Sequence, residues 1–411
     1  IVLGHIHDHL REGASEDMAF CQEMAQRYAL PFAVKQIRVR ELARKEGLSL
    51  ETAARNYRYQ ALEEMAGEMQ CADIALGHTA DDQAETILSH FLRGSGVRGL
   101  AGIPFRNGRR VRPILTLYRH EILDYLRQCG ETYRVDESNR DLRYRRNLIR
   151  HRLLPQLTRE FNPNLPETLN RIAEIHQQVE HFLDFQAQIA LAEITKVRTQ
   201  HKIVLDIDRF WRYFTIVRKY ILRNALEALS GKLFRPDFAA LSRIEDLISR
   251  REIGRRLPLQ GKWEVLIDHD GFVLWDGHWR RFNLEIKPGQ SAVLDSKRIL
   301  SISEKLPVNR NVKKVANTYN QYIDADQIQG VFRVRNVKSG DRYKPLGLGG
   351  HKKVLDLLSD RKVPLHLRPE VPVLIYGDEI VWVVGFQINE NFKITDQTRQ
   401  MLHLQIKEVV S

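Results

Sequence analysis

Apolar and polar positions alternate along roughly the first 130 residues in a way that predicts strands and helices in turn. Short apolar runs fit strands, and apolar residues at spacings of three and four fit helices. The predicted elements lie at 1–5, 15–28, 32–37, 49–69, 73–76 and 81–92. Such alternation is typical of an α/β fold whose parallel sheet is covered by helices. Ligands of these sheets bind at the carboxyl ends of strands, where His5 and His78 lie.

The rest of the chain follows two other patterns. From about 164 to 229 apolar residues keep a helical spacing with few Gly or Pro residues, which predicts a mostly helical region. Between about 254 and 284 short alternating runs predict strands instead. The last part mixes both types, with a helix expected at 352–358 and strands at 373–376 and 380–384.

A chain of 411 residues is too long for one hydrophobic core. We therefore expect three domains. An α/β domain with a Rossmann-like parallel sheet should come first, a mostly helical connecting domain second, and a small mixed α/β domain last. The expected boundaries are 1–157, 158–290 and 291–411.

The charge balance favours a polyanionic partner. The chain has 64 basic and 52 acidic residues, a formal charge of +12, and nucleic acid is the first candidate. Cys21, Cys71 and Cys129 are odd in number and widely spaced, which excludes a disulfide framework or a structural zinc site. No apolar run reaches the ~18 residues of a membrane span, so we expect a cytoplasmic protein without membrane contact.

The junction after the strand at 73–76 carries the densest group of reactive side chains. Thr79 followed by Asp82 resembles a capping box, which predicts that the helix begins there. Glu85 shares a helix face with Asp81 and with Asp82, and such a cluster can hold a hydrated Mg²⁺ against phosphates. The alternative is structural, because acidic residues in a first helical turn are favoured by the helix dipole alone.

Two smaller groups of residues could bind phosphate, although a structural role is the simpler interpretation of each taken alone. Arg55 and Arg58 lie on a predicted helix, where they could face a phosphate or pair with acidic neighbours on the surface. Arg93, Gly94 and Gly96 close the acidic helix with a flexible basic loop. Glycines allow backbone amides to approach a phosphate, but they also cap ordinary helices.

The segment from 134 to 152 is a stronger candidate for nucleic-acid contact. Six arginines lie between 140 and 152 with only Asp141 against them. A helix from about Arg145 would have one buried side and one side that faces phosphates. A solvated basic surface is the alternative.

Taken together, these motifs resemble the tRNA(Ile)-lysidine synthetase family of N-type ATP pyrophosphatases. In the first part the matching motifs are HIHDHLR (5–11), ETAARNYRY (51–59), GHTADDQAET (77–86), RGSG (93–96), RP (112–113), DESN (136–139) and RNLIR (146–150). In the last part they are GDR (340–342), KK (352–353), KVP (362–364), Arg368, PVL (372–374) and VWVVG (381–385). The resemblance covers nearly the whole chain, and the ordered set is far more specific than any single member.

The resemblance implies a two-step reaction on tRNA(Ile) with a CAU anticodon. ATP adenylates the C2 oxygen of the wobble cytidine and releases pyrophosphate. The amine of L-lysine then displaces AMP to give lysidine. The first step needs charge stabilisation on phosphates by Mg²⁺ and arginines, and a well-placed weak nucleophile.

The resemblance also implies roles for individual residues. The implied catalytic residues are His78, Asp81, Asp82, Glu85, Asp136 and Arg146. The implied contacts of ATP and the reacting groups are Arg55, Arg93, Gly94, Gly96, Arg112, Asn139 and Arg150. The implied tRNA-binding residues are Arg143, Arg145, Arg342, Lys352, Lys353 and Arg368. The implied Mg²⁺ ligands are Asp81, Asp82 and Glu85.

One motif of the family has no counterpart in this sequence. The Ser-Gly-Gly-x-Asp-Ser pyrophosphate loop should follow the first strand, and we expect that strand, the loop and its helix upstream of Ile1. Two rival functions follow. A tRNA-binding protein without catalysis would lack the loop altogether, and a related tRNA thiolase would commonly use paired cysteines, which this sequence does not contain.

Overall fold

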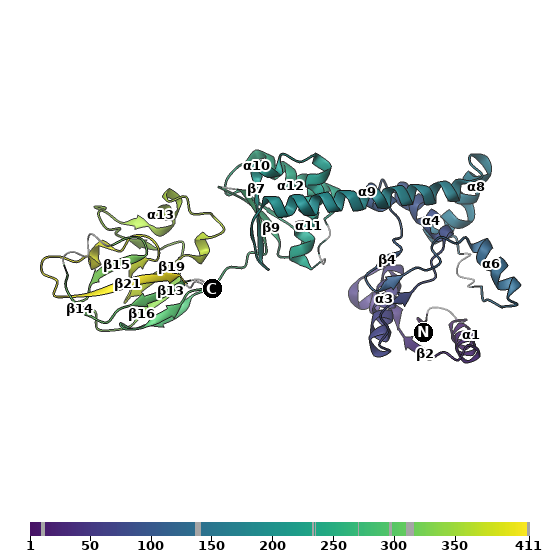
Figure 1. Ribbon diagram of the computed structural model, residues 1–411, viewed down its shortest axis with the longest axis horizontal. Helices are drawn as coiled ribbons and strands as arrows, with labels where there is room; N and C mark the ends of the chain where they lie inside the picture. The colour runs from purple at the N-terminus through teal and green to yellow at the C-terminus, as the bar shows by residue number, and fades with distance from the viewer. Residues whose placement is uncertain are drawn as a thin grey trace. The chain divides into compact units, whose positions relative to one another are not determined.

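The computed structural model divides into two compact units, Ile1–Phe182 and Leu183–Ser411, which are described separately (Figure 1). The structure describes residues 1–9, 13–135, 141–231, 234, 236–269, 271–295, 298–309 and 316–408. No helix among these residues is long and apolar enough to cross a membrane.

The first unit begins with the expected strand–helix–strand unit. Strand β1 (Leu3–His7) pairs in parallel with β2 (Phe32–Gln36), and α1 (Ala14–Arg27) connects them. Helices α2 (Val39–Glu46) and α3 (Leu50–Glu68) follow and pack on each other. The α/β class of this part is therefore confirmed, although α2 was not expected.

A second small sheet carries the junction that precedes the acidic helix. Strand β3 (Ile74–Ala75) pairs in parallel with β5 (Arg110–Val111), and β4 (Arg106–Asn107) pairs antiparallel with β5. The expectation of one sheet through all the early strands was wrong for the described residues, since β1–β2 and β3–β5–β4 are separate ladders. β3 is only two residues long. The backbone N–H of Ile74 donates to the carbonyl of Arg109, and that of Leu76 donates to the carbonyl of Val111.

Helix α4 (Ala80–Phe91) forms a core with the helices that follow the basic segment. Its Ala84, Ile87 and Leu88 pack against Ile149 and Leu169. The basic segment is helical from Arg145 as predicted, and it contains a π-helical stretch, a feature often found at functional sites. The helices of this region are α5 (Val97–Leu100), α6 (Arg119–Gln128), α7 (Arg145–Leu148), η2 (Ile149–Leu153, π-helical), α8 (Leu154–Glu160) and α9 (Leu165–Ile194).

The second unit starts with a five-stranded sheet in the order β6-β7-β10-β9-β8. The expectation of an unbroken helical region up to 229 was wrong, because β6 and β7 interrupt it. The short apolar run Ile203-Val204-Leu205, rich in β-branched residues, fits a strand that is buried on both faces. The strands are β6 (Thr195–Arg198), β7 (Lys202–Asp206), β8 (Arg256–Pro258), β9 (Glu264–Asp268) and β10 (Gly271–Trp275).

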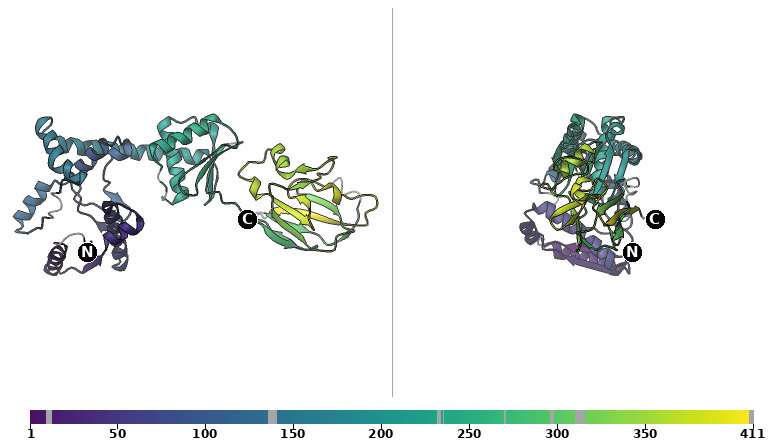
Figure 2. Two further views of the ribbon diagram at one scale, coloured as in Figure 1. Left: turned by 180° about the vertical axis from the view of Figure 1, so that it is seen from behind. Right: turned by 90° about the vertical axis from the view of Figure 1, so that its left-hand side faces the viewer.

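Helices α9, α11 and α12 pack on one face of this sheet (Figures 1 and 2). Alternate strand residues such as Leu205, Ile267 and Phe272 point into that core and are at most 1% exposed. The helices that complete this layer are α10 (Ile207–Phe210), α11 (Thr215–Ser230) and α12 (Phe238–Arg250).

The rest of the second unit is mainly β-structure, and we call residues 283–408 the C-terminal module. One sheet has the order β11-β16-β19-β20. In the other, β13, β14 and β15 each pair with β21, and β12 pairs with β13. The predicted strands at 373–376 and 380–384 are confirmed as β19 and β20. The strands are β11 (Asn283–Ile286), β12 (Ser291–Val293), β13 (Arg298–Ile302), β14 (Leu306–Pro307), β15 (Asn320–Asp324), β16 (Phe332–Asn336), β19 (Pro372–Tyr376), β20 (Glu379–Val383) and β21 (Gln400–Glu408).

Short elements complete the C-terminal module. Helix α13 (Val354–Asp360) begins two residues later than predicted, because Lys352 and Lys353 form β18 instead and pair with β17 (Arg342–Tyr343). Two short 3₁₀ helices, η4 (Arg368–Glu370) and η5 (Glu390–Phe392), flank β19 and β20. The three domain boundaries stay a prediction.

Candidate active site

The acidic helix begins where its sequence predicts. Asp82 N donates to Thr79 Oγ1 at 3.4 Å, and Thr79 N donates to Asp82 Oδ2 at 2.9 Å, which completes the capping box. Asp81 has a different partner: its Oδ2 accepts a hydrogen bond from the backbone N–H of Arg119 at 2.7 Å. The cap fixes the first turn of α4 and leaves one Asp82 oxygen for other partners.

Two arginines from the basic segment bind the acidic face of α4. Arg146 donates through Nη2 to Asp82 Oδ1 at 2.7 Å and through Nε to Glu85 Oε2 at 3.0 Å. Arg150 donates through Nη2 to the same Asp82 oxygen at 2.8 Å and through Nε to Glu85 Oε1 at 2.5 Å. We call these four side chains the arginine–carboxylate cluster. The structure thus brings together four predicted site residues from two distant segments.

Burial differs sharply within the arginine–carboxylate cluster. The side chain of Glu85 is 2% exposed, that of Asp82 16% and that of Arg146 45%. Burial alone lowers the pKa of Arg150, but the hydrogen bond and charge of Glu85 outweigh it, so that pKa is raised. Buried ion pairs contribute little net stability, because desolvation offsets most of the attraction. The arrangement therefore fixes side-chain positions more than it stabilises the fold.

The cluster does not fit the predicted magnesium site. Asp82 and Glu85 are already neutralised by two guanidinium groups, and Asp81 binds a backbone amide. Among the described residues no group of three or more His, Cys, Asp or Glu side chains could hold a metal ion. Mg²⁺ needs carboxylate oxygens free to coordinate it, so these three residues do not form its site in this arrangement.

A cavity of about 510 Å³ opens beside the cluster. Asp82 and Arg146 reach its wall, whereas Glu85 lies behind them. The cavity lies between α3, the end of β3 and the start of α7. Its lining residues are Leu50, Ala54, Arg55, Arg58, Tyr59, Leu62, Leu76, Gly77, His78, Asp82, Tyr144 and Arg146.

The α3 wall of the cavity is cationic and aromatic. The guanidinium carbon of Arg55 lies 5.7 Å from the centre of the Tyr59 ring. That of Arg110 on β5, which pairs with Glu63 outside the cavity lining, lies 4.6 Å from the same ring. Arg112 is buried behind this wall, with Nη1 bonded to Pro104 O at 2.6 Å and Nε without a partner. Burial lowers the pKa of Arg112. This concentration of positive charge suits an anion with an apolar or aromatic part.

His78 lies at the end of β3, half-buried in the cavity wall, and its Nδ1 has no hydrogen-bond partner. Burial lowers its pKa, and although Asp82 opposes the shift, Arg112, Arg146 and Arg55 add to it. We therefore expect a neutral imidazole at pH 7.

NMR of histidine-labelled protein measures this directly. The resonance lost in His78→Gln assigns the signal, and its titration midpoint should lie below the ordinary value of about 6.5. A midpoint above that value would contradict the burial of His78 in a cationic wall.

Three predicted ATP contacts lie away from this cavity. Arg93, Gly94 and Gly96 follow the carboxyl end of α4, whereas Asp82 lies in the first turn of that helix, roughly 14 Å along its axis from Phe91. Arg93 donates to Ser89 Oγ at 2.8 Å, and Gly94 takes the left-handed conformation of a helix end with φ of 72°. Asp136 and Asn139 lie outside the described residues.

The predicted tRNA-binding residues divide into two groups. In the first unit Arg145 is exposed, while Arg143 is paired with Asp141 at 2.7 Å. In the C-terminal module Arg342 and Lys353 lie directly opposite each other on β17 and β18, and both are exposed. Like charges in that position repel, which favours a role in binding an anion over a structural role.

The other two predicted contacts in the C-terminal module are partly engaged. Lys352 forms an ion pair with Asp360, and Arg368 Nε donates to Val363 O at 2.9 Å. Both contacts lie within the C-terminal module, so these two residues present less free charge than Arg342 and Lys353.

Part of the cavity lining was not predicted from the sequence. Tyr144 was not singled out, and Tyr59 was named only as part of a motif; Arg110, which reaches the Tyr59 ring from β5, was also missed. A signal for Arg110 exists, since it lies two residues before Arg112 on an extended segment and so shares its side. Tyr144 gives no such signal, because only the folded chain brings it beside α3.

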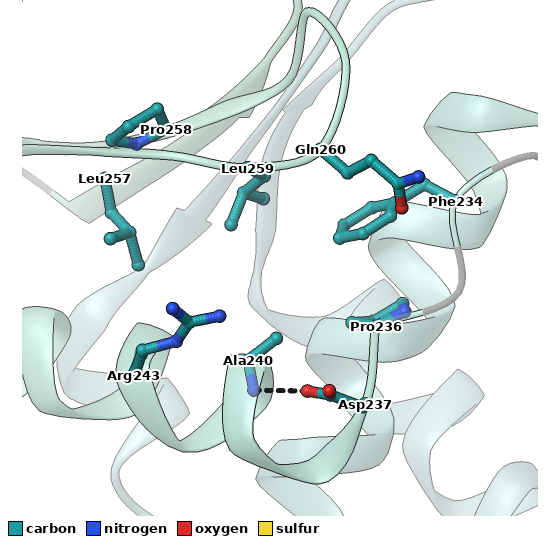
Figure 3. Close-up of a pocket in the computed structure, with 9 residues that line it drawn as sticks. All are labelled: Phe234, Pro236, Asp237, Ala240, Arg243, Leu257, Pro258, Leu259 and Gln260. Carbon is teal, nitrogen blue, oxygen red and sulfur yellow. Dashed lines mark hydrogen bonds between the residues drawn. The ribbon is translucent and has the colours of Figure 1, made fainter.

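A second cavity, of about 270 Å³, lies between α12 and β8 in the second unit (Figure 3). Its walls mix apolar side chains such as Phe234 and Leu257 with polar ones such as Arg243 and Gln260. Asp237, the acidic residue in its lining, accepts from Ala240 N at 2.7 Å and so caps α12. The carboxylate of Asp237 is therefore engaged in the cap, and the lining of this cavity has no counterpart of the arginine–carboxylate cluster.

Comparisons with known proteins agree with this geometry. Residues 1–157 match the PP-loop domain family, and residues 332–406 match the TilS substrate C-terminal domain family. The tRNA(Ile)-lysidine synthase of Clostridium tetani is 30% identical over 424 residues, which cover 99% of this chain and 88% of that protein. That of Geobacter sulfurreducens is 33% identical over 419 residues, covering 99% and 87%. That of Caldanaerobacter subterraneus is 29% identical, covering 97% and 85%. The chain therefore belongs to the tRNA(Ile)-lysidine synthase family.

Proposed function

We propose that this protein is an ATP-dependent tRNA(Ile)-lysidine synthetase. In the proposed reaction the C2 oxygen of the wobble cytidine attacks ATP and pyrophosphate leaves. The amine of L-lysine then attacks C2, AMP leaves with that oxygen, and the proton released by the amine passes to a base. The observation that carries the proposal is the single cavity that combines a cationic wall with the arginine–carboxylate cluster. A tRNA substrate places the reaction in the cytoplasm.

The cationic wall would hold the phosphates of ATP. Arg55 lies on the cavity surface without an acidic partner among the ion pairs of the described residues, so its guanidinium can form charge-assisted hydrogen bonds to phosphate oxygens. A neutral His78 would donate or accept a hydrogen bond beside the nucleotide without repelling lysine. The PP-loop match of residues 1–157 supports ATP as the nucleotide.

The two carboxylates of the cluster would act differently. Asp82 reaches the cavity surface and is proposed to face the lysine amine. Glu85 is almost fully buried and is proposed to position Arg146 and Arg150, which would carry positive charge toward the adenylated cytidine. None of the acidic residues of α4 is proposed as a magnesium ligand.

The first domain, at 1–157, would carry out the chemistry, and the domains at 158–290 and 291–411 would bind tRNA. Arg145 in the first unit, and Arg342 with Lys353 in the C-terminal module, are the exposed cations proposed to contact phosphates. The last domain match, at residues 332–406, includes the pair on β17 and β18.

Binding of tRNA is expected to weaken steeply with salt, because each phosphate contact releases counterions. Replacing both Arg342 and Lys353 with alanine should lower the slope of log K against log salt by about 2. Filter binding at several salt concentrations measures this slope. Lys35→Ala is the control, since that ammonium is already paired with Glu64 and Glu68. An unchanged slope in the double variant would contradict the assignment.

The function is tested with full-length protein, ATP, labelled lysine and tRNA(Ile) with a CAU anticodon. We expect lysine incorporation that requires ATP and yields AMP and pyrophosphate. Binding of tRNA without incorporation would favour the non-catalytic alternative. AMP formation that depends on a sulfur donor in place of lysine would favour the thiolase.

A further inference from the structure

The sheet β6-β7-β10-β9-β8 is buried on both faces, although its helices cover only one. On the second face Val204, Leu266, Val273 and Trp275 are all at most 6% exposed. These side chains form a small core with Leu365, which belongs to the segment between α13 and η4 of the C-terminal module. A residue far along the chain therefore covers the face that the helices leave open.

A buried carboxylate anchors this segment. Asp268, the last residue of β9, is 5% exposed and accepts the backbone N–H of Leu365 at 2.9 Å and of His366 at 3.1 Å. It also accepts from His366 Nδ1 at 2.7 Å and from the backbone N–H of His269 at 2.8 Å. Three of these four bonds join the middle sheet to the C-terminal module. A carboxylate that accepts several hydrogen bonds is well satisfied in its charged form.

Further polar contacts hold the same junction. Lys202 on β7 pairs with Glu370 of η4 at 3.3 Å. Asp276, just after β10, accepts from Lys262 at 2.7 Å and from His201 at 3.0 Å, with its side chain 1% exposed. Burial alone would raise the pKa of Asp276, but these two partners lower it to about 2. Asp276 thus holds the chain where it leaves β10 toward the C-terminal module, and Asp268 and Lys202 hold the segment 363–371, which we call the docked segment.

The docked segment shares a core with the proposed tRNA contacts. Val363 and Val371, on either side of His366, pack with Tyr343 and Val354, the neighbours of Arg342 and Lys353. Movement of the segment 363–371 would therefore move the basic pair on β17 and β18. The position of that pair relative to the middle sheet depends on the Asp268 anchor.

We propose that Asp268 is a positioning residue for tRNA, which holds the C-terminal module on the middle sheet so that its basic pair meets the tRNA at a fixed spacing. The proposal rests on the proposed function for its tRNA. When two parts of a binding surface are held at the right spacing, the second contact becomes intramolecular and affinity rises without new contacts. Release of the anchor would lower the affinity for tRNA and leave the chemistry in the first unit unchanged.

Hydrogen exchange of the full-length protein tests the anchor, because the amides of Leu365 and His366 donate to Asp268. In Asp268→Ala, exchange at 363–368 should become faster than in the wild type, whereas exchange in β21 should not change. The matched control is Asp326→Ala, which removes a carboxylate bound to the amides of Arg399 and Gln400 within the C-terminal module. If Asp268→Ala does not fold, Asp268→Asn keeps the packing and should show a smaller effect in the same direction.

Kinetics test the positioning role. KM for tRNA should rise roughly 10-fold in Asp268→Ala, with kcat at saturating tRNA and KM for ATP within about two-fold of the wild type. Unchanged exchange at 363–368, or faster exchange with an unchanged KM for tRNA, would overturn the proposal. If the wild-type protein transfers no lysine, the proposed function fails, and exchange together with equilibrium tRNA binding still decides whether the anchor positions the module.

Discussion

Glu85→Gln is expected to lower kcat/KM for lysine transfer by at least ~100-fold while the protein stays folded. Glu85 is 2% exposed and binds Arg146 and Arg150 at once. Glutamine keeps the shape of the side chain, but it removes the charge and one acceptor oxygen, which leaves Asp82 as the carboxylate that holds both guanidinium groups. Displacing these cations by a fraction of an ångström would misplace the charge that stabilises the adenylated cytidine.

Steady-state kinetics and circular dichroism measure this prediction together. The matched control is Glu160→Gln, an exposed glutamate of α8 that pairs with Arg159. That variant should keep the activity of the wild type, since exposed pairs contribute little. An active Glu85→Gln protein would contradict the positioning role. An inactive protein with an unfolded spectrum would assign Glu85 to stability.

Arg55→Met is expected to raise KM for ATP by roughly 10- to 100-fold and to leave the thermal midpoint almost unchanged. A charge-assisted hydrogen bond to a phosphate contributes about 1.5–3 kcal/mol, which accounts for this range. Arg55 lines the cavity, and its guanidinium lies near the Tyr59 ring. Methionine can therefore keep the apolar contacts that the stem of the arginine side chain makes.

Arg127→Met is the control for charge alone. Arg127 lies on α6, its side chain is 78% exposed, and it pairs with Asp124. Titration of ATP in the presence of saturating tRNA and lysine should separate the two variants. An equal KM for ATP in both would remove Arg55 from the nucleotide site.

Local sequence determines the start of α4, and it was predicted for that reason. The Thr79–Asp82 capping box lies within four residues and depends on no distant part of the chain. The pairing of Arg150 with Asp82 is different, because 68 residues separate the two side chains. The sequence supplied both as site residues, but only the fold shows that these carboxylates pair with arginines of a distant segment.

The same distinction explains the errors in the fold. The strand at 202–206 is short and follows a helix of 30 residues, so helical spacing dominated the expectation there. Strand pairing also depends on distant partners, and for that reason the separation of β1–β2 from β3–β5 had no local signal. The contact of His366 with Asp268 spans 98 residues and could not be predicted.

The mass of the wobble nucleoside after reaction tests the central claim most directly. Full-length protein is incubated with ATP, isotope-labelled L-lysine and tRNA(Ile) with a CAU anticodon, and the tRNA is digested to nucleosides. The account predicts that the wobble cytidine gains the mass of one labelled lysine less one water, and only when ATP is present. A wobble cytidine of unchanged mass, with ATP, lysine and bound tRNA all present, would contradict it.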